Sequence, residues 1–288
     1  MTLLSVVIAY LILRWYGAAK PLHHDGWYYR WCEWLANPPV LARTPLSAMV
    51  LAILGPVIAL VLLLILASSI WYWLQLFIAV PVLLYSVGRG KYAGIVMRYG
   101  RARQQQDWVG ATACHQSLGM PDQGELDRVD QDDWAGLDQR MMMAVSYRGF
   151  ERIFAVLFWF VLLGPAGALI YRLSTLYLQA EPGQQQNHDS ARYWLWLLEW
   201  PAARVLGLSF ALTGNFVGCI QAWRDHLWST AHGTAEVLYH AVLGALQVDE
   251  ALPASADTTE REFKAVLSLF SRTVIFWLCV LAVITVLL

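Results

Sequence analysis

Charged residues are scarce in this sequence, and neither sign is in excess. Only 14% of the 288 residues are Asp, Glu, Lys or Arg, and the formal net charge is -1 at pH 7. Proteins that bind nucleic acid present a basic surface to the phosphates. The charge balance therefore argues against a nucleic-acid partner.

Cysteine is also scarce, and its spacing does not fit a metal site or a disulfide framework. The four cysteines include no C-x-x-C pair, since Cys32 and Cys114 lie in polar stretches and Cys219 and Cys279 in apolar ones. Neither a structural zinc site nor a set of disulfides is expected.

Two widespread catalytic motifs are missing as well. Residues 88–91 have the sequence G-R-G-K, but the phosphate-binding pattern G-x-x-x-x-G-K-[ST] is not satisfied, and no G-x-S-x-G motif occurs. The sequence therefore excludes a P-loop nucleotide site and a serine nucleophile of the α/β-hydrolase type.

Hydrophobic residues, in contrast, are abundant. They make up 58% of the chain, with 15 Trp and 13 Tyr, and the mean hydropathy is +0.46. Trp and Tyr collect at membrane interfaces, and about 20 consecutive apolar residues are needed to cross a bilayer. This composition indicates an integral membrane protein.

The apolar runs predict an all-α polytopic fold with about five transmembrane helices and a helical cytoplasmic region. A run at 3–13 is short for a span and would be a sixth one if it inserts. Gly164, Pro165 and Gly167 predict a kinked helix that faces other helices or a cavity. The expected spans are 46–67, 70–87, 153–171, 201–220 and 273–288.

Three consecutive regions follow from this pattern. Residues 1–87 hold an amphipathic, interfacial segment and a transmembrane hairpin, and 88–152 form a helical cytoplasmic loop. Residues 153–288 form a C-terminal membrane part with a cytoplasmic helical segment at 221–272. Lys and Arg flank the hairpin on both sides, which places those flanks in the cytoplasm, whereas the glutamine-rich segment 179–190 is expected on the opposite side.

One motif stands out in the third region. Residues 157–159 are L-F-W, and residues 163–172 are L-G-P-A-G-A-L-I-Y-R. Together they resemble the P-L-F-W…G-G-x-P-G-A-x-x-Y-[KR] signature of the CobD/CbiB membrane family. Further matches follow the family's order along the chain: Gly26 with Glu33, Trp200-Pro201 with Arg204 and Gly214, and Ser229 with Gly233 and Glu236.

Departures from that family concern the residues of its cobalamin-synthesis branch. Where that branch has E-N-x-x-D, this chain has Tyr147, Arg148 and Glu151, so only one acid remains, and Ala231 replaces an asparagine. The chain thus resembles the AmpE branch more closely. This resemblance implies a multi-pass protein of the bacterial inner (cytoplasmic) membrane that takes part in control of inducible β-lactamase and in the response to cell-wall fragments.

Three residues at helical spacing form the sharpest candidate site. His232, Glu236 and His240 recur every four residues within a predicted helix at 222–248, which puts them on one face. Two imidazoles beside a carboxylate could bind a divalent metal or move a proton. The alternative is the polar face of an amphipathic helix, which is favoured because metal sites normally draw a ligand from a second element, and no metal site is assigned.

Two further groups of charged residues could hold an anion. Arg148, Glu151 and Arg152 precede the central span, where they are either a phosphate or carboxylate site or ordinary juxtamembrane charge. Arg204 lies near a span end, where it faces a cavity or snorkels to the interface. Five loop acids predict a solvated face or, less favoured, a Mg²⁺-nucleotide site: Asp127, Asp130, Asp132, Asp133 and Asp138.

The preferred hypothesis is a sensor and regulator that binds a small anionic ligand, such as a muropeptide or a nucleotide, in a membrane-embedded cavity. The other expected partners are the lipid bilayer and, in a homo-oligomer, further copies of the chain. The full set of candidate ligand-binding residues is Glu33, Arg148, Glu151, Arg152, Tyr171, Arg172, Arg204, His232, Glu236 and His240.

The competing hypothesis is a CobD-like synthase that condenses a carboxylate with an amine. By the family resemblance it would use ATP and Mg²⁺, with Glu151 and Glu236 as catalytic residues. Convergence of Glu33, Glu151 and Glu236 in one cavity would favour the synthase, whereas arginines and aromatic residues would favour the binding protein. A transporter would need a polar path, for which the spans offer only Arg204, Thr213 and Asn215.

Overall fold

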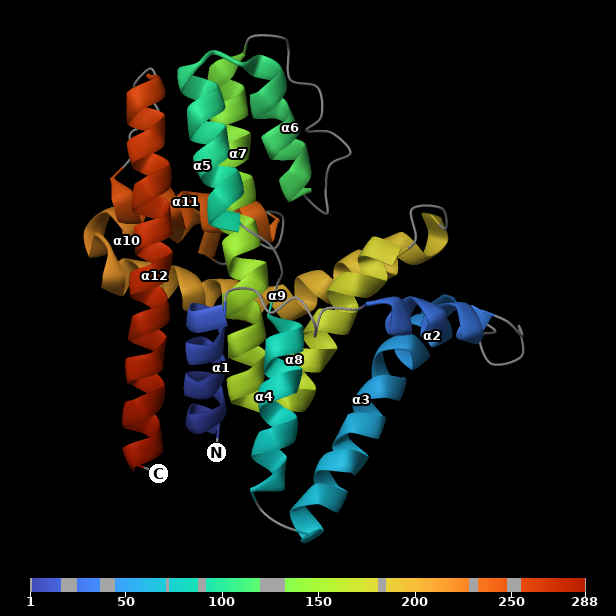
Figure 1. Cartoon of the computed structure of the whole chain (residues 1–288). Helices are drawn as coiled ribbons and strands as arrows, with labels where there is room; N and C mark the ends of the chain where they lie inside the picture. The colour runs from blue at the N-terminus through green and yellow to red at the C-terminus, as the bar shows by residue number, and fades with distance from the viewer. Residues whose placement is uncertain are drawn as a thin grey trace. The chain divides into compact units, whose positions relative to one another are not determined.

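The computed structural model describes residues 2–16, 25–36, 45–70, 73–87, 92–119, 133–180, 185–227, 233–247 and 255–287 (Figure 1). Within these ranges every regular element is a helix, which confirms the predicted all-α class. The elements are α1 Thr2–Tyr16, α2 Gly26–Ala36, α3 Pro45–Ile70, α4 Leu74–Ser86, α5 Tyr92–Gln104, α6 Trp108–Leu118, α7 Trp134–Gly149, a π-helix Phe150–Phe154, α8 Ala155–Ala180, α9 Gln185–Thr213, α10 Phe216–Leu227, α11 Thr234–Leu246 and α12 Ala256–Leu287.

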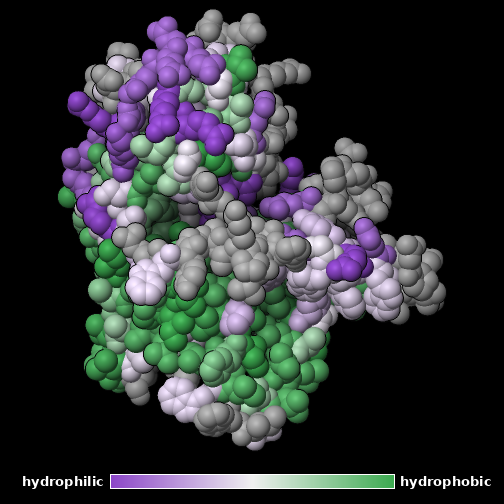
Figure 2. Space-filling model, in the orientation of Figure 1, coloured by the Kyte–Doolittle hydropathy of each residue, from purple (hydrophilic) through white to green (hydrophobic). Residues whose placement is uncertain are grey.

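Four helical stretches are long and apolar enough to cross a membrane, namely Ser47–Ser69, Trp134–Gln179, Asp189–Thr213 and Thr258–Leu287. Shorter apolar helices occur at Leu3–Leu13, Leu74–Ser86 and Thr234–Leu246. Figure 2 shows hydrophobic side chains gathered over α3 and α4 and hydrophilic ones over α5. The chain is therefore a multi-pass membrane protein, and the bilayer is its partner, as the sequence predicted.

Tertiary contacts divide the chain into two compact units. The first unit consists of Met1–Arg89 and Ala155–Glu199, and the second of Gly90–Phe154 and Trp200–Leu288. Each unit combines segments that are far apart in the sequence. The division at 87 and 152 expected from hydropathy follows the chain in order and stays a prediction.

The first unit is built around α8, which packs against α3 and α4, while α1 packs along α4 and α8. α2 lies within the predicted interfacial segment, and its Tyr28 hydroxyl donates a hydrogen bond to the Leu173 carbonyl at 3.3 Å. Burial raises the pKa of Tyr28, so this hydroxyl stays protonated and remains a donor. The core of the unit consists of Tyr28, Met49, Ile53, Val57, Leu60, Leu169, Leu173, Leu176 and Ala191.

α8 is folded back on itself, which is the largest departure from the prediction. Gly164 has φ 67° and ψ -155°, a conformation that only glycine adopts readily. A Cβ atom added to Gly167 would collide with the backbone oxygen of Trp159, eight residues earlier. In a continuous helix these positions would lie about 12 Å apart. Figure 1 shows the two arms of α8 running in opposite directions.

The prediction of a single kinked span at 153–171 is thus wrong, because the chain reverses direction within it. The break itself falls at the predicted glycine and proline. The arm before the break is the end of a helical stretch that begins at Trp134, and the arm after the break runs back beside it as far as Gln179. Ala155 and Ala180 consequently lie at the same end of the hairpin. This geometry does not support the expected position of Gln179 on the opposite side of the membrane, and residues 181–184 of that segment lie outside the described residues.

In the second unit, two helices begin with the same four-residue pattern. Asp107 starts α6 and accepts a hydrogen bond from the Gly110 N–H at 2.9 Å. Asp133 starts α7 and accepts one from the Gly136 N–H at 3.0 Å. A carboxylate at this position satisfies an N–H group that would otherwise have no helical partner. The tryptophan after each aspartate meets its counterpart edge to face, with ring centroids 5.0 Å apart.

Two predicted helices of the C-terminal part have different bounds. The expected span at 201–220 is wrong, because α9 ends at Thr213 and α10 begins at Phe216. Asn215 ends the run, since its side-chain oxygen accepts a hydrogen bond from the Gly218 N–H at 2.8 Å. The expected helix at 222–248 is also wrong, because α11 begins at Thr234 after an extended Gly233.

The glycine spacing that predicted close helix packing is explained by the contact between α10 and α11. A Cβ atom on Gly218 would lie 2.6 Å from the Gly244 oxygen, and one on Gly214 would lie 2.8 Å from the Ala245 oxygen. The predicted close approach is confirmed, although Gly214 lies in the break before α10. Backbone contact at this distance leaves no room for any larger residue.

Candidate functional site

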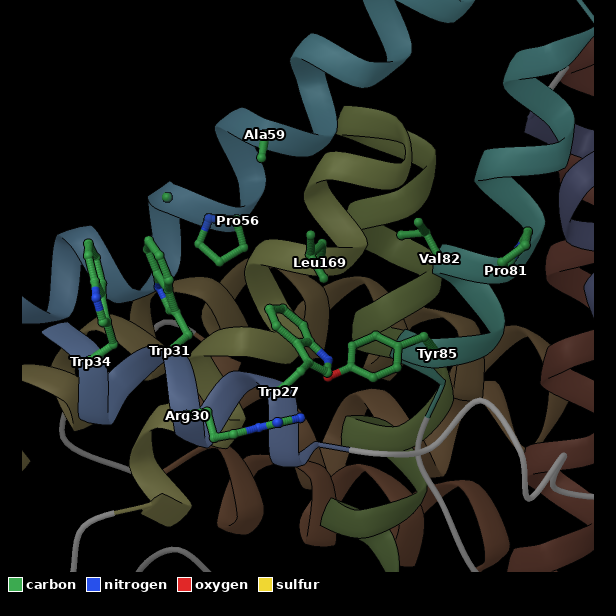
Figure 3. A pocket seen from close by; sticks show the side chains of 11 residues that line it. Trp27, Arg30, Trp31, Trp34, Pro56, Ala59, Pro81, Val82, Tyr85 and Leu169 are labelled. Atoms are coloured by element: carbon green, nitrogen blue, oxygen red, sulfur yellow. The ribbon is translucent and has the colours of Figure 1, made fainter.

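A groove in the first unit is the leading candidate for a ligand site. Its volume is about 850 Å³, and α2, α3, α4 and α8 form its walls (Figure 3). These segments are separated by up to 140 residues in the chain, so no local pattern predicts the groove. It is lined by Trp27, Arg30, Trp31, Trp34, Gly55, Pro56, Ala59, Pro81, Val82, Tyr85 and Leu169.

The wall between α2 and α3 depends on a glycine. A Cβ atom on Gly55 would lie 2.8 Å from Cζ2 of Trp31, so the absence of a side chain lets this indole rest against the helix backbone. Trp31 in turn stacks on Trp34, with ring centroids 5.3 Å apart and an interplanar angle of 21°. Two prolines, Pro56 and Pro81, lie inside α3 and α4 and line the groove.

A polar cluster borders the groove at Tyr85. The Tyr85 hydroxyl donates a hydrogen bond to Oδ1 of Asp25 at 3.1 Å. The other carboxylate oxygen of Asp25 lies 3.5 Å from Nη2 of Arg172, and both side chains are about 11% exposed. Asp25 therefore offsets the charge of Arg172, a predicted ligand-binding residue, beside the groove rather than in its wall.

Most of the polar groups that line the groove are hydrogen-bond donors. Nε of Arg30 donates to the Gly26 carbonyl at 3.2 Å. Nε1 of Trp31 is buried and has no hydrogen-bond partner among the described residues. Arginine and tryptophan side chains can only donate hydrogen bonds, so these groups would be satisfied by a ligand that accepts them.

Glu199 is a buried carboxylate that the sequence analysis missed. It is 3% exposed, and its Oε1 accepts a hydrogen bond from the hydroxyl of Tyr171, a predicted site residue, at 3.2 Å. The signal was available, because Glu199 is the single acid in the apolar stretch 194–203, and such a residue normally faces a polar partner. It lies immediately before the Trp200-Pro201 pair that carried part of the family resemblance.

In the second unit, the predicted residues Arg148, Glu151 and Arg152 lie together at the π-helix. Arg148 donates from Nε to the Leu118 carbonyl at 2.6 Å and forms an ion pair with the buried Glu151. The Arg152 guanidinium lies over the Tyr92 ring, 5.7 Å from its centroid. π-Helical turns are frequent at functional sites. Here, however, Glu151 already balances the charge of Arg148.

The remaining predicted residues are distributed over both units. Glu33 is exposed on α2 and does not line the groove, whereas Glu236 and His240 lie on α11 of the second unit. This helix begins at Thr234, whereas His232 lies outside the described residues. Within the described ranges, no three His, Cys, Asp or Glu side chains are grouped so as to hold a metal ion.

The polar residues that a transport path would need have local roles. The Arg204 guanidinium lies over the Trp200 ring at 4.6 Å and donates to the Trp200 carbonyl at 3.3 Å. Thr213 hydrogen-bonds to Thr273 at 2.9 Å, and Asn215 caps α10. These contacts explain why polar residues occur in this apolar region.

Comparison with known proteins gives partial similarity. The chain is 30% identical over 127 residues to cobalamin biosynthesis protein CobD of Stutzerimonas stutzeri, covering 42% of this chain and 41% of that protein. It is 30% identical over 121 residues to the CobD protein of Chromobacterium violaceum, covering 40% and 38%. No family model matches, and no solved structure does so significantly. The chain thus spans about two fifths of the length of these curated relatives, and over that part the similarity supports the resemblance to the CobD/CbiB family.

Proposed function

We propose that this membrane protein binds an anionic ligand in the groove of its first unit and acts as a regulator of the AmpE kind. The proposed role is in control of inducible β-lactamase and in the response to cell-wall fragments, at the bacterial inner membrane. The observation that carries the proposal is the chemistry of the groove wall, where the polar groups are donors and the one charged lining residue among those described is Arg30.

Apart from Tyr85, the polar groups of the wall favour a ligand that accepts hydrogen bonds. The indoles of Trp27, Trp31 and Trp34 can only donate, as can the guanidinium of Arg30. The Tyr85 hydroxyl donates a hydrogen bond to Asp25 and also interacts with the Trp27 indole, so the donors left for a ligand are those of Trp31, Trp34 and Arg30. A ligand that brings a phosphate or a carboxylate would satisfy the donors, and a hydrogen bond to a charged group contributes about 1.5–3 kcal/mol.

The composition of the groove also favours binding over condensation chemistry. An arginine and four aromatic residues line it, whereas Glu33, Glu151 and Glu236 do not. A synthase of the proposed kind would need carboxylates to hold a metal-bound phosphate. A groove lined by an arginine and aromatic residues, without these carboxylates, favours a ligand-binding protein over a synthase.

A second candidate function is a CobD-like synthase that joins a carboxylate to an amine. The similarity to two cobalamin biosynthesis proteins favours it, as does the buried Glu151 at a π-helix. The described residues do not fit a Mg²⁺-ATP site well, because Glu151 is paired with Arg148 and no group of three potential ligands lies near it. We therefore assign no catalytic step to Glu151 or Glu236.

Thermal unfolding of the purified full chain in detergent separates the two candidates. We expect an anhydro-muropeptide to raise the midpoint, because a ligand at 100 times its Kd stabilises the folded state by about 2.7 kcal/mol. The Arg30→Gln variant should lose most of this rise, and Arg101→Gln, an exposed arginine on α5, should keep it. A rise with ATP and Mg²⁺ or with a corrinoid, and none with the muropeptide, would favour the synthase instead.

A further inference from the structure

We infer that the occupant of the groove is an amphiphile, namely a bilayer phospholipid with an anionic headgroup. Its acyl chain would lie against the apolar wall, and its phosphate would lie at Arg30. The inference rests on the proposed function in locating the ligand in this groove, and it adds the chemical class of that ligand.

The first argument is the apolar character of the wall. Apart from Arg30 and the edge hydroxyl of Tyr85, the described lining residues present aliphatic, proline and indole surfaces. A soluble anion would leave most of a volume of about 850 Å³ in contact with apolar groups alone. A hydrocarbon chain gains about 0.8 kcal/mol for each CH₂ group that it buries, so it suits this wall.

The second argument is the setting of the groove in the membrane. α3, which contributes Gly55, Pro56 and Ala59, is a candidate span, and its outer face exposes large apolar side chains. These residues are Leu54, Ile58, Leu62, Ile65 and Leu66, with exposures between 39% and 62%. Because a candidate span forms one wall of the groove, bilayer lipid is the neighbour that can reach the groove.

The third argument is the position of charge. α2 carries Trp27 and Trp34, which are 39% and 59% exposed, and tryptophan at such positions is typical of a helix at the membrane interface. In Figure 3, Arg30 lies along α2 at one edge of the groove, while Pro56 and Ala59 lie on α3 toward the opposite edge. This separation of a cation from an apolar wall matches the two ends of an anionic phospholipid.

Photocrosslinking of the full chain in lipid nanodiscs tests the inference. The probes are phosphatidylglycerol and phosphatidylcholine, each with a diazirine in one acyl chain, and mass spectrometry identifies the labelled peptides. We expect phosphatidylglycerol to label peptides that contain residues 27–34 and 81–85 more strongly than phosphatidylcholine does. Arg30→Gln should lower this preference about fivefold, as the loss of one cation at a membrane surface predicts.

Two variants control for other causes. Ala59→Trp should reduce groove labelling by both lipids because it fills the apolar wall. Arg101→Gln should leave labelling unchanged, which separates a specific contact from general attraction of anionic lipid to a cationic protein. Equal labelling by the two lipids, with no effect of Arg30→Gln, would overturn the inference. Because Arg30 is exposed, Arg30→Gln changes the surface and leaves the core intact.

The thermal shift with the soluble anhydro-muropeptide, compared with the lipid labelling, distinguishes this inference from the proposed function. A thermal shift with an anhydro-muropeptide that needs Arg30, together with lipid labelling that ignores Arg30, would overturn the lipid inference and leave the proposed function standing. Selective labelling by phosphatidylglycerol, without any shift by the muropeptide, would support the lipid inference and reject the muropeptide as ligand.

Discussion

At the scale of single residues, Asp138 connects three helices of the second unit. Its carboxylate accepts hydrogen bonds from Nε of Arg103 at 3.0 Å, from the Tyr99 hydroxyl at 2.6 Å and from the Thr259 hydroxyl at 3.3 Å. It is 8% exposed. The expectation that Asp138 belongs to a solvated acidic face is therefore wrong, because the donors come from α5 and α12, far away in the sequence.

Replacing this carboxylate should destabilise the second unit. We expect Asp138→Ala to lower the free energy of unfolding by about 3–5 kcal/mol, because it leaves buried Arg103 without its carboxylate. The midpoint of thermal unfolding in detergent measures the effect. Lys264→Ala, which breaks an exposed pair with Glu260 at 2.5 Å, should cost only about 0.3–0.5 kcal/mol. Similar midpoints for both variants would contradict the assigned role of Asp138.

Cys114 gives a prediction about pH. Burial, the main cause, raises the pKa of this thiol above its ordinary value, while the positive charge of Arg98 partly opposes the increase and the negative charge of Asp107 adds to it. The thiolate is the reactive form, so iodoacetamide should modify Cys114 more slowly than free cysteine at pH 8, and its rate profile should shift to higher pH. Because the raised pKa belongs to the folded state, its stabilising effect is present below about pH 8.5 and declines as pH rises through the folded pKa.

Mass spectrometry of the peptide that contains Cys114, after timed alkylation between pH 7 and pH 10, measures this profile. The urea-unfolded chain is the control, in which the ordinary profile of a cysteine should return. A folded-state profile equal to that of the unfolded chain would show that the thiol is not shielded as described.

At the scale of elements, the hairpin in α8 depends on the backbone at Gly164. The φ of 67° combined with ψ of -155° lies in a region that is essentially restricted to glycine. The arms then meet so closely that Gly167 has no room for a side chain. Hydropathy cannot distinguish this path from a straight span, because both arms are apolar.

Changing the reversal residue should therefore be costly. Gly164→Ala is expected to destabilise the protein by about 1–3 kcal/mol, since alanine is strained at this conformation although the space beside it is open. Gly233→Ala is the matched control, because Gly233 has open space and an ordinary φ of -65°. The midpoints of thermal unfolding of both variants measure the difference in stability. Equal midpoints would argue against the reversed conformation at Gly164.

At the scale of the whole molecule, two hairpins of the first unit determine how its segments meet the membrane. The α3–α4 hairpin turns near Trp73 and the α8 hairpin turns at Gly164, and Figure 1 shows both turns directed to the same end of this unit. The opposite end carries α2 and the C-terminal end of α8. Gln179 should thus share a membrane side with Glu33 rather than with Trp73.

Single cysteines in a background without the four native ones test this arrangement. A membrane-impermeant maleimide should label Gln179→Cys and Glu33→Cys from one side, and Trp73→Cys from the other, in spheroplasts compared with inverted vesicles. All three positions are exposed. Labelling of Gln179→Cys together with Trp73→Cys would restore the original expectation that α8 crosses the bilayer.

Part of the candidate site could be predicted from sequence, and part could not. The sequence predicted helices over the segments that form the groove, and the break in α8 falls at the predicted glycine and proline. The pairing of Arg172 with Asp25, the buried Glu199 and the wall made by Trp31 on Gly55 were not predicted. Each of these depends on side chains that come within 4 Å only after distant segments have packed.

The sequence by itself determined the class of this protein, because the length and apolar content of its helices are local properties that fix how they partition into a bilayer. It also determined where several helices begin, since capping by Asp107, Asp133 and Asn215 involves only the next three residues. Only the tertiary structure decided that α8 turns back and that four segments enclose a groove. The groove depends on contacts between residues far apart along the chain, and the reversal depends on the backbone conformation at Gly164. Hydropathy carries no information about either.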